Sequence, residues 1–160
     1  MKKGPHPVLY DRTDTERLSS VEFGIIRPGL SSQEISVWLW NKKNFDDAPV
    51  AEGVRITAVA ANDYADEIVD NRYISVKSCG VMDPDVAGIV DDDEDEYTAI
   101  GGPLTDPDSY HLIGDIPTNC ARRLWFKIET PAEFSVSGLP RIIVQVGFLS
   151  EEVKWLYASE

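Results

Sequence analysis

A stretch of twelve residues, 83–94, carries acidic side chains at the spacing of a calcium-binding loop. Asp83, Asp85, Asp91 and Glu94 stand at its first, third, ninth and twelfth positions, and a glycine stands at the sixth. An EF-hand loop uses this arrangement to surround Ca²⁺ with oxygen ligands. Ala87, at the fifth position, supplies no side-chain oxygen, and neither flank has a helical pattern. We therefore expect an acidic loop that needs no cofactor, with calcium binding by the four carboxylates as the alternative.

Four tryptophans are candidates for a platform on which a sugar ring stacks. They are Trp38, Trp40, Trp125 and Trp155. Tryptophan in strands more often fills a core or an interface, where each side chain buries about 150–250 Å². We therefore expect these rings to serve packing, with a carbohydrate-binding β-sandwich module as the alternative.

The other residues with reactive side chains are two histidines and two cysteines. His6 lies between prolines and His111 in an expected loop, and neither is held beside a nucleophile or a metal ligand. Cys79 and Cys120 have no metal-site spacing, so we expect two buried thiols, with a disulfide between them as the alternative. The sequence has no nucleophile motif, phosphate-binding glycine loop or zinc-binding helix motif. It therefore predicts a protein that is not an enzyme.

Charge limits the partners of this 160-residue chain. Its formal net charge of −13 is unsuited to nucleic acid and to anionic membranes, both of which attract Lys and Arg. No apolar run approaches the ~20 residues of a membrane-spanning helix. Residues 4–7 are Gly, Pro and His where a secretory signal would be apolar. We expect no nucleic-acid partner, no membrane insertion and synthesis in a cytoplasm.

The elements that must position these residues alternate between apolar and polar side chains. In residues 34–41, Ile35, Val37 and Leu39 share one face, and Ser36 shares the other with two tryptophans. Similar segments are residues 21–26, 54–60, 72–78, 97–100, 123–128 and 142–148. Residues 62–71 fit either a helical turn or a long loop. Seven or eight strands separated by turns predict an all-β fold: an antiparallel β-sandwich, immunoglobulin-like or jelly-roll-like, with long loops and little helix.

Three segments are expected along the chain. Residues 1–20 are polar and turn-rich apart from a short apolar patch, and they predict a mobile N-terminal arm. Residues 21–149 predict the β-sandwich domain, interrupted by a solvated acidic loop at 82–96, where like charges repel. Residues 150–160 predict a C-terminal tail. In this tail Val153, Leu156 and Tyr157 have helical spacing, and a further strand is the alternative.

Short motifs spread over residues 20–149 resemble a known type of protein. The motifs are Arg27-Pro28-Gly29, Glu34-Ile35-Ser36-Val37-Trp38-Leu39-Trp40-Asn41-Lys42-Lys43, Gly53-Val54-Arg55-Ile56-Thr57, Ile100-Gly101-Gly102, Ile113-Gly114-Asp115-Ile116-Pro117 and Arg123-Leu124-Trp125-Phe126-Lys127-Ile128. In this pattern the chain resembles the immunoglobulin-like β-sandwich modules of bacteriophage and prophage virions, which occur in tails, baseplates, necks and fibres. The acidic loop and the C-terminal tail lie outside the resemblance.

The resemblance implies a structural protein that acts by protein–protein contact and carries no catalytic site. It implies other virion proteins as partners, a homo-oligomer, and a location in the virion after synthesis in the host cytoplasm. An acidic sandwich with few chemical motifs suits such a role, because exposed strands and loops supply a contact surface without a catalytic pocket. A calcium-binding or carbohydrate-binding β-sandwich module remains the alternative function.

Overall fold

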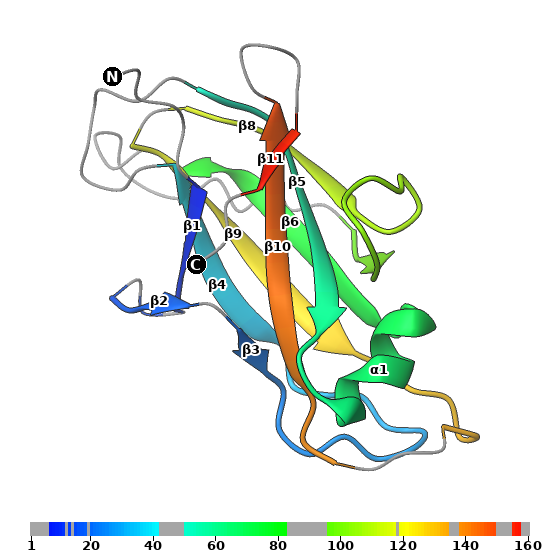
Figure 1. The fold of residues 1–160 in the computed structure, drawn as a ribbon. Helices are drawn as coiled ribbons and strands as arrows, with labels where there is room; N and C mark the ends of the chain where they lie inside the picture. Colours follow the sequence, from blue (N-terminus) through cyan, green and yellow to red (C-terminus); the bar gives the residue numbers. More distant parts are fainter. Residues whose placement is uncertain are drawn as a thin grey trace.

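The alternating side chains build two sheets that pack face to face. The structure, a computed structural model, describes residues 7–11, 13, 15–18, 20–41, 50–82, 96–117, 119–134, 138–149 and 155–157. Within these residues the strands pair only antiparallel, and a short helix lies at one end of the molecule (Figure 1). The expected all-β antiparallel β-sandwich is therefore confirmed.

The described strands divide into a six-stranded sheet and a five-stranded sheet. The six-stranded sheet has the order β2-β1-β4-β9-β6-β7. Its strands are β1 (Pro7–Tyr10), β2 (Arg17–Leu18), β4 (Ile35–Asn41), β6 (Ile74–Met82), β7 (Thr98–Ile100) and β9 (Ala121–Ile128). The five-stranded sheet has the order β11-β10-β5-β8, and β3 pairs with the first residues of β10. Its strands are β3 (Val21–Glu22), β5 (Ala51–Ala60), β8 (His111–Ile116), β10 (Arg141–Leu149) and β11 (Trp155–Tyr157).

The core lies between the inner faces of the two sheets. Val37 and Leu39 of β4, Leu124 and Phe126 of β9, and Ile56 of β5 are completely buried in it. Alternate residues along each strand supply these side chains, as the two-residue period of a strand requires. Burying each such side chain stabilises the fold by about 1.5–3 kcal/mol. The outer faces are left to carry other functions.

Residues 62–71, for which a helical turn and a loop were both open, form the helix α1 (Asp63–Asp70). Asn62 caps it, because its side-chain oxygen accepts a hydrogen bond of 3.2 Å from the backbone N–H of Ala65. Ala65, Ile68 and Val69 are buried on the side that faces the sandwich. The helix therefore closes one end of the core. Among the described residues, no helix is long and apolar enough to span a membrane.

The N-terminal segment differs from the expected mobile arm. β1 pairs with β4 within the same chain, with Leu9 opposite Leu39, and Val8 and Leu9 are buried. β1 and β2 form a hairpin whose turn is held by Asp11, which accepts a hydrogen bond of 3.0 Å from the N–H of Thr15. The short apolar patch is therefore a strand of the six-stranded sheet, because it pairs with the edge of β4. Residues 1–6 lie outside the described residues.

Two further segments depart from the sequence expectations. The expected strand at 21–26 is regular only at β3, after which Ile26 forms an isolated bridge with Gly138. Gly24 has a φ of 77°, a conformation that favours glycine, and the strand is interrupted there. At the C-terminus, Trp155–Tyr157 pair with β10 as β11, so the strand alternative holds within the expected tail.

Polar side chains link the two sheets at the end of the sandwich opposite α1. Arg122 of β9 donates hydrogen bonds to the carbonyl of Cys79 on β6, at 3.2 Å, and to the carbonyl of Asp115 on β8, at 3.1 Å. Asn41 of β4 is completely buried and donates to the carbonyl of Ile116, at 3.0 Å. These bonds satisfy backbone carbonyls, that of Ile116 being buried, and they link the two sheets.

Candidate interaction surface

A loop between β3 and β4 is held rigidly against the rest of the sandwich. Its Arg27-Pro28-Gly29 turn is closed by a hydrogen bond of 3.2 Å from the N–H of Leu30 to the carbonyl of Arg27. The N–H of Gly29 donates to the carbonyl of Pro131 at 3.0 Å, and Thr130 Oγ1 donates to the carbonyl of Arg27 at 3.1 Å. The loop therefore keeps its shape without a partner.

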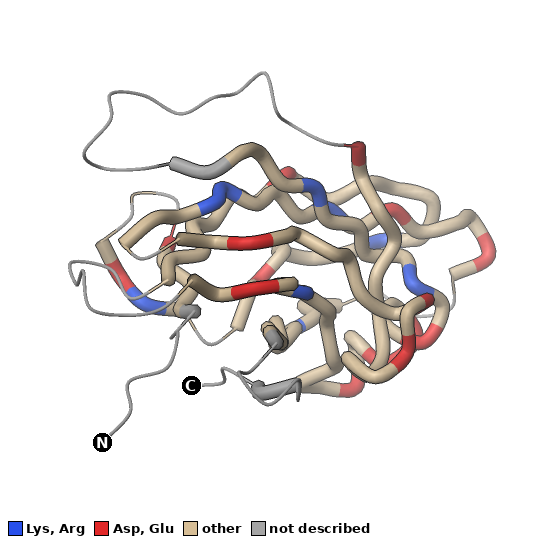
Figure 2. The backbone as a smooth tube through the Cα atoms, turned by 90° about the horizontal axis from the view of Figure 1, so that it is seen from above, with Lys and Arg blue, Asp and Glu red and all other residues tan. Residues whose placement is uncertain are grey.

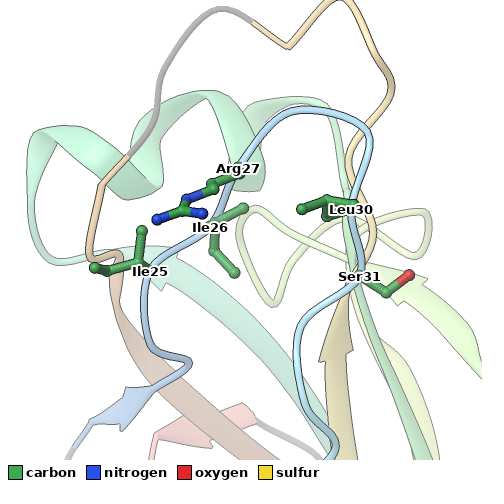
Figure 3. Close-up of a pocket in the computed structure, with 5 residues that line it drawn as sticks. All are labelled: Ile25, Ile26, Arg27, Leu30 and Ser31. Carbon is green, nitrogen blue, oxygen red and sulfur yellow. The ribbon is translucent and has the colours of Figure 1, made fainter.

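This loop surrounds a small hollow. The hollow has a volume of about 250 Å³ and is lined by Ile25, Ile26, Arg27, Leu30 and Ser31. Ile26 is buried, whereas Ile25 and Leu30 expose 66% and 58% of their surfaces. Figure 3 shows the Leu30 side chain pointing from one arm of the loop towards Ile26 on the other. The hollow is open and its lining is mixed, so it is suited to a partner side chain that makes apolar contact with Leu30 and places a carboxylate beside Arg27.

Exposed apolar side chains extend from the hollow over the end of the sandwich that carries α1. Of the seven exposed large apolar residues in the described part of the chain, four are Ile25, Leu30, Tyr64 and Leu139. The bridge between Ile26 and Gly138 places Ile25 opposite Leu139. A Cβ added to Gly138 would overlap the ring of Tyr64, so this ring lies against the same backbone. We call these four residues the α1-end patch.

The sequence did not single out this patch, although it contained one indication of it. Ile25 and Ile26 are adjacent, so a strand-like segment must turn one of them outward. Grouped exposed apolar side chains mark contact sites more often than single exposed apolar side chains do. The patch has no group arranged for covalent chemistry, and its chemistry is that of binding.

The predicted calcium ligands Asp83, Asp85, Asp91 and Glu94 lie outside the described residues. Within the ranges that the structure describes, no group of three or more His, Cys, Asp and Glu side chains is placed to hold a metal ion. Calcium binding at residues 83–94 therefore stays an untested alternative to the expected acidic loop.

Of the four tryptophans considered as a sugar platform, the structure describes the side chains of three, and two of these are buried. Trp38 and Trp40 are 8% and 3% exposed, so their ring faces are covered. Trp125 is half-buried and has Arg123 and Lys77 over its ring, at 5.0 Å and 5.3 Å from the centroid. Nothing is described of the Trp155 side chain.

Of the histidines and cysteines, the structure describes His111, Cys79 and Cys120. His111 begins β8, and His6 is outside the described residues. Cys79 and Cys120 are both buried and in the thiol form, which confirms the expectation for them and not the disulfide alternative. A scan of protein-family models finds no match to this chain, and a search of curated proteins finds no relative.

Proposed function

We propose that this protein is a structural subunit that acts by protein–protein contact, of the kind built into phage and prophage particles. The observation that supports contact most strongly is the α1-end patch. The motif-level resemblance to virion β-sandwich modules supports the particle class. In this proposal the protein has no catalytic role, it is made in the host cytoplasm, and its partners are other virion proteins and further copies of itself.

The α1-end patch has two properties that favour binding. Its apolar side chains are exposed to water, and covering them is worth about 25 cal/mol per Å² of apolar surface. The loop that carries Ile25 and Leu30 is already anchored to Thr130 and Pro131 by hydrogen bonds. The loop therefore loses little conformational entropy when a partner binds. A flexible loop would lose more, and this loss would offset more of the binding energy.

Charge indicates why an apolar surface is needed for self-association. At a net charge of −13 two copies repel one another at long range. Apolar contact is short-ranged and insensitive to this repulsion, and Arg27 at the hollow is available for a carboxylate of the neighbouring copy. The α1-end patch and the adjacent Arg27 together offer the two interactions that an acidic subunit needs.

Sedimentation velocity over a wide concentration range tests this function. We expect the wild-type protein to form a defined oligomer, and Leu30→Asp to weaken association at least about tenfold, because a charge is placed at the centre of an apolar contact. Leu112→Asp is the control, since Leu112 is 55% exposed on β8 outside the patch. A strictly monomeric wild-type protein, or equal effects of the two substitutions, would contradict the proposal.

Genomic neighbourhood tests the particle class separately from self-association. Neighbouring genes for capsid, portal or tape-measure proteins would support a virion subunit. Neighbours that encode only metabolic enzymes would count against it, whatever the oligomeric state.

A further inference from the structure

The outer face of the six-stranded sheet carries a stack of alternating aromatic rings and cationic groups, which we call the cation–aromatic ladder. It crosses β4, β9 and β6 and reaches the residue before β7. In spatial order its members are Trp38, Arg123, Trp125, Lys77, Tyr97 and Lys127. Figure 2 shows acidic positions on several sides of the molecule, while several basic positions follow neighbouring strands along the upper side of the view. The ladder therefore brings three cationic side chains together on a protein whose net charge is −13.

Contacts between neighbours hold the ladder in order. The guanidinium carbon of Arg123 lies 5.5 Å from the Trp38 ring centroid and 5.0 Å from that of Trp125. Lys77 Nζ lies 5.3 Å from the Trp125 centroid and 4.9 Å from that of Tyr97, and Lys127 Nζ lies 4.2 Å from Tyr97. Strand pairing places Arg123 opposite Trp38 and Lys77 opposite Trp125. Rings beneath cations keep the charged groups at fixed positions.

The cations of the ladder differ in how their charge is balanced. Lys77 lies 4.0 Å from a carboxylate oxygen of Glu34, and Lys127 lies 2.8 Å from one of Glu129. Arg123 has no carboxylate partner among the described residues, although the chain contains 28 acidic residues. Its Nη2 donates to Ser36 Oγ at 3.2 Å, and its buried Nε has no hydrogen-bond partner in the described part.

Among the described residues no carboxylate pairs with this half-buried arginine, and a desolvated charge is costly unless it is paired. A carboxylate from outside the chain would remove this cost. The pair between Lys127 and Glu129 is also exchangeable, since Glu129 is 58% exposed and such surface pairs contribute little.

The spacing of the cations defines the shape of the anion. Arg123 and Lys127 lie on the same face of β9, four residues apart, which corresponds to about 13 Å along a strand. Carboxylates four residues apart in an extended peptide have the same separation. Trp125 and Tyr97 each have two cations over their rings, so they offer little free ring face to a sugar. A peptide therefore matches the surface better than a glycan does.

We propose that the cation–aromatic ladder binds an extended acidic segment of a partner protein, with its carboxylates on Arg123 and Lys127. Arg123 is the principal anchor, because its charge is the unbalanced one. This site is distinct from the α1-end patch, so the protein has two contact surfaces of different chemistry.

Binding of a short synthetic peptide with glutamate at every second position tests this site on the full chain. Fluorescence anisotropy of the labelled peptide gives the affinity. We expect binding at low salt, and no binding of the same peptide with glutamine in place of glutamate. Arg123→Gln should weaken binding about tenfold or more, and Lys127→Gln about threefold, in line with the strength of charged hydrogen bonds.

Two control variants separate binding from folding. Arg141→Gln removes a cation of the other sheet that pairs with Glu22 at 3.1 Å, and it should leave the affinity within about twofold. Arg123→Lys keeps the charge and should restore part of the binding that Arg123→Gln loses, at a similar thermal stability. The proposal is overturned if wild-type protein does not bind the peptide, if Arg123→Gln and Arg141→Gln have equal effects, or if only an acidic oligosaccharide binds.

Discussion

The α1-end patch and the cation–aromatic ladder differ in chemistry and in the elements that carry them. The patch is apolar and lies mainly on loops, where polar residues are the norm, and the ladder is charged and lies on the strands of a sheet. The ladder is held in place by the core, because the residues that alternate with its members on β9 are buried. A sandwich with a regular interior is thus able to present two surfaces with opposite chemistry. Substitutions and salt should therefore affect self-association through the patch and peptide binding to the ladder differently.

The largest effect is expected from a substitution in the core beneath the ladder. Phe126 is completely buried in β9, between the ladder residues Trp125 and Lys127. Phe126→Ala should lower the free energy of unfolding by about 3–5 kcal/mol, because it removes a large buried side chain and leaves a cavity. Urea denaturation measures this loss. Self-association and peptide binding should both weaken under conditions in which the variant is partly unfolded, and retention of full stability would contradict the assigned core.

Salt should have the next largest effect and should act on one surface alone. Binding of the acidic peptide to the ladder should weaken on the order of tenfold between low and high ionic strength, since exposed charges are screened. Self-association through the α1-end patch should be unchanged or become stronger, because salt also screens the repulsion between acidic subunits. Titrations of the two equilibria at matched salt concentrations compare them. Parallel weakening of both would show that the patch is not the apolar contact described above.

A smaller and local effect is expected at the α1 end. Gly138→Ala places a methyl group where the ring of Tyr64 lies, and the ring must move, at a cost of about 1 kcal/mol or more. Thermal unfolding should show this loss, and self-association should change with it. Peptide binding to the ladder should stay as in the wild type. A variant with wild-type stability would mean that Tyr64 does not pack on this backbone.

The smallest effect concerns the β1–β2 hairpin, which belongs to neither surface. The hydrogen bond from the Thr15 N–H lowers the pKa of Asp11 below its ordinary value of 3.8, with the Thr13 hydroxyl and the Glu16 N–H adding to it. The stabilisation is therefore present above the pKa of the unfolded chain and is lost as the pH falls through the lowered pKa of the folded state. Hydrogen exchange below pH 4 should show earlier opening of this hairpin, and Asp11→Ala should remove the pH dependence. A pH-independent hairpin in the wild type would contradict this.

Sequence periodicity predicted the interior better than the edges. The alternation in residues 34–41 and 123–128 gave the correct buried faces of β4 and β9, because a strand's period depends on local geometry alone. Val8 and Leu9 were assigned to an arm, since the strand they pair with lies about thirty residues away and its register is a tertiary property. Residues 62–71 held a good N-cap in Asn62, but so short a helix depends on burial against the sandwich.

Only some of the residues of the two candidate surfaces could be predicted from the sequence. Alternation places Arg123, Trp125 and Lys127 on one face of β9 without any structure. The positions of Lys77 and Tyr97 beside them follow from the strand order β4-β9-β6-β7, which joins segments distant in the chain. The hollow at Ile25 and Leu30 depends on hydrogen bonds to Thr130 and Pro131, which no local pattern indicates.

The most direct test of two separate contact surfaces is one sedimentation velocity experiment with the labelled acidic peptide, run on wild-type protein, Leu30→Asp and Arg123→Gln. The wild type should sediment as an oligomer that carries the peptide. Leu30→Asp should sediment as a smaller species that still carries the peptide, and Arg123→Gln as an oligomer without it. If either substitution abolishes both association and peptide binding in a folded protein, or if the wild type shows neither, the account is contradicted.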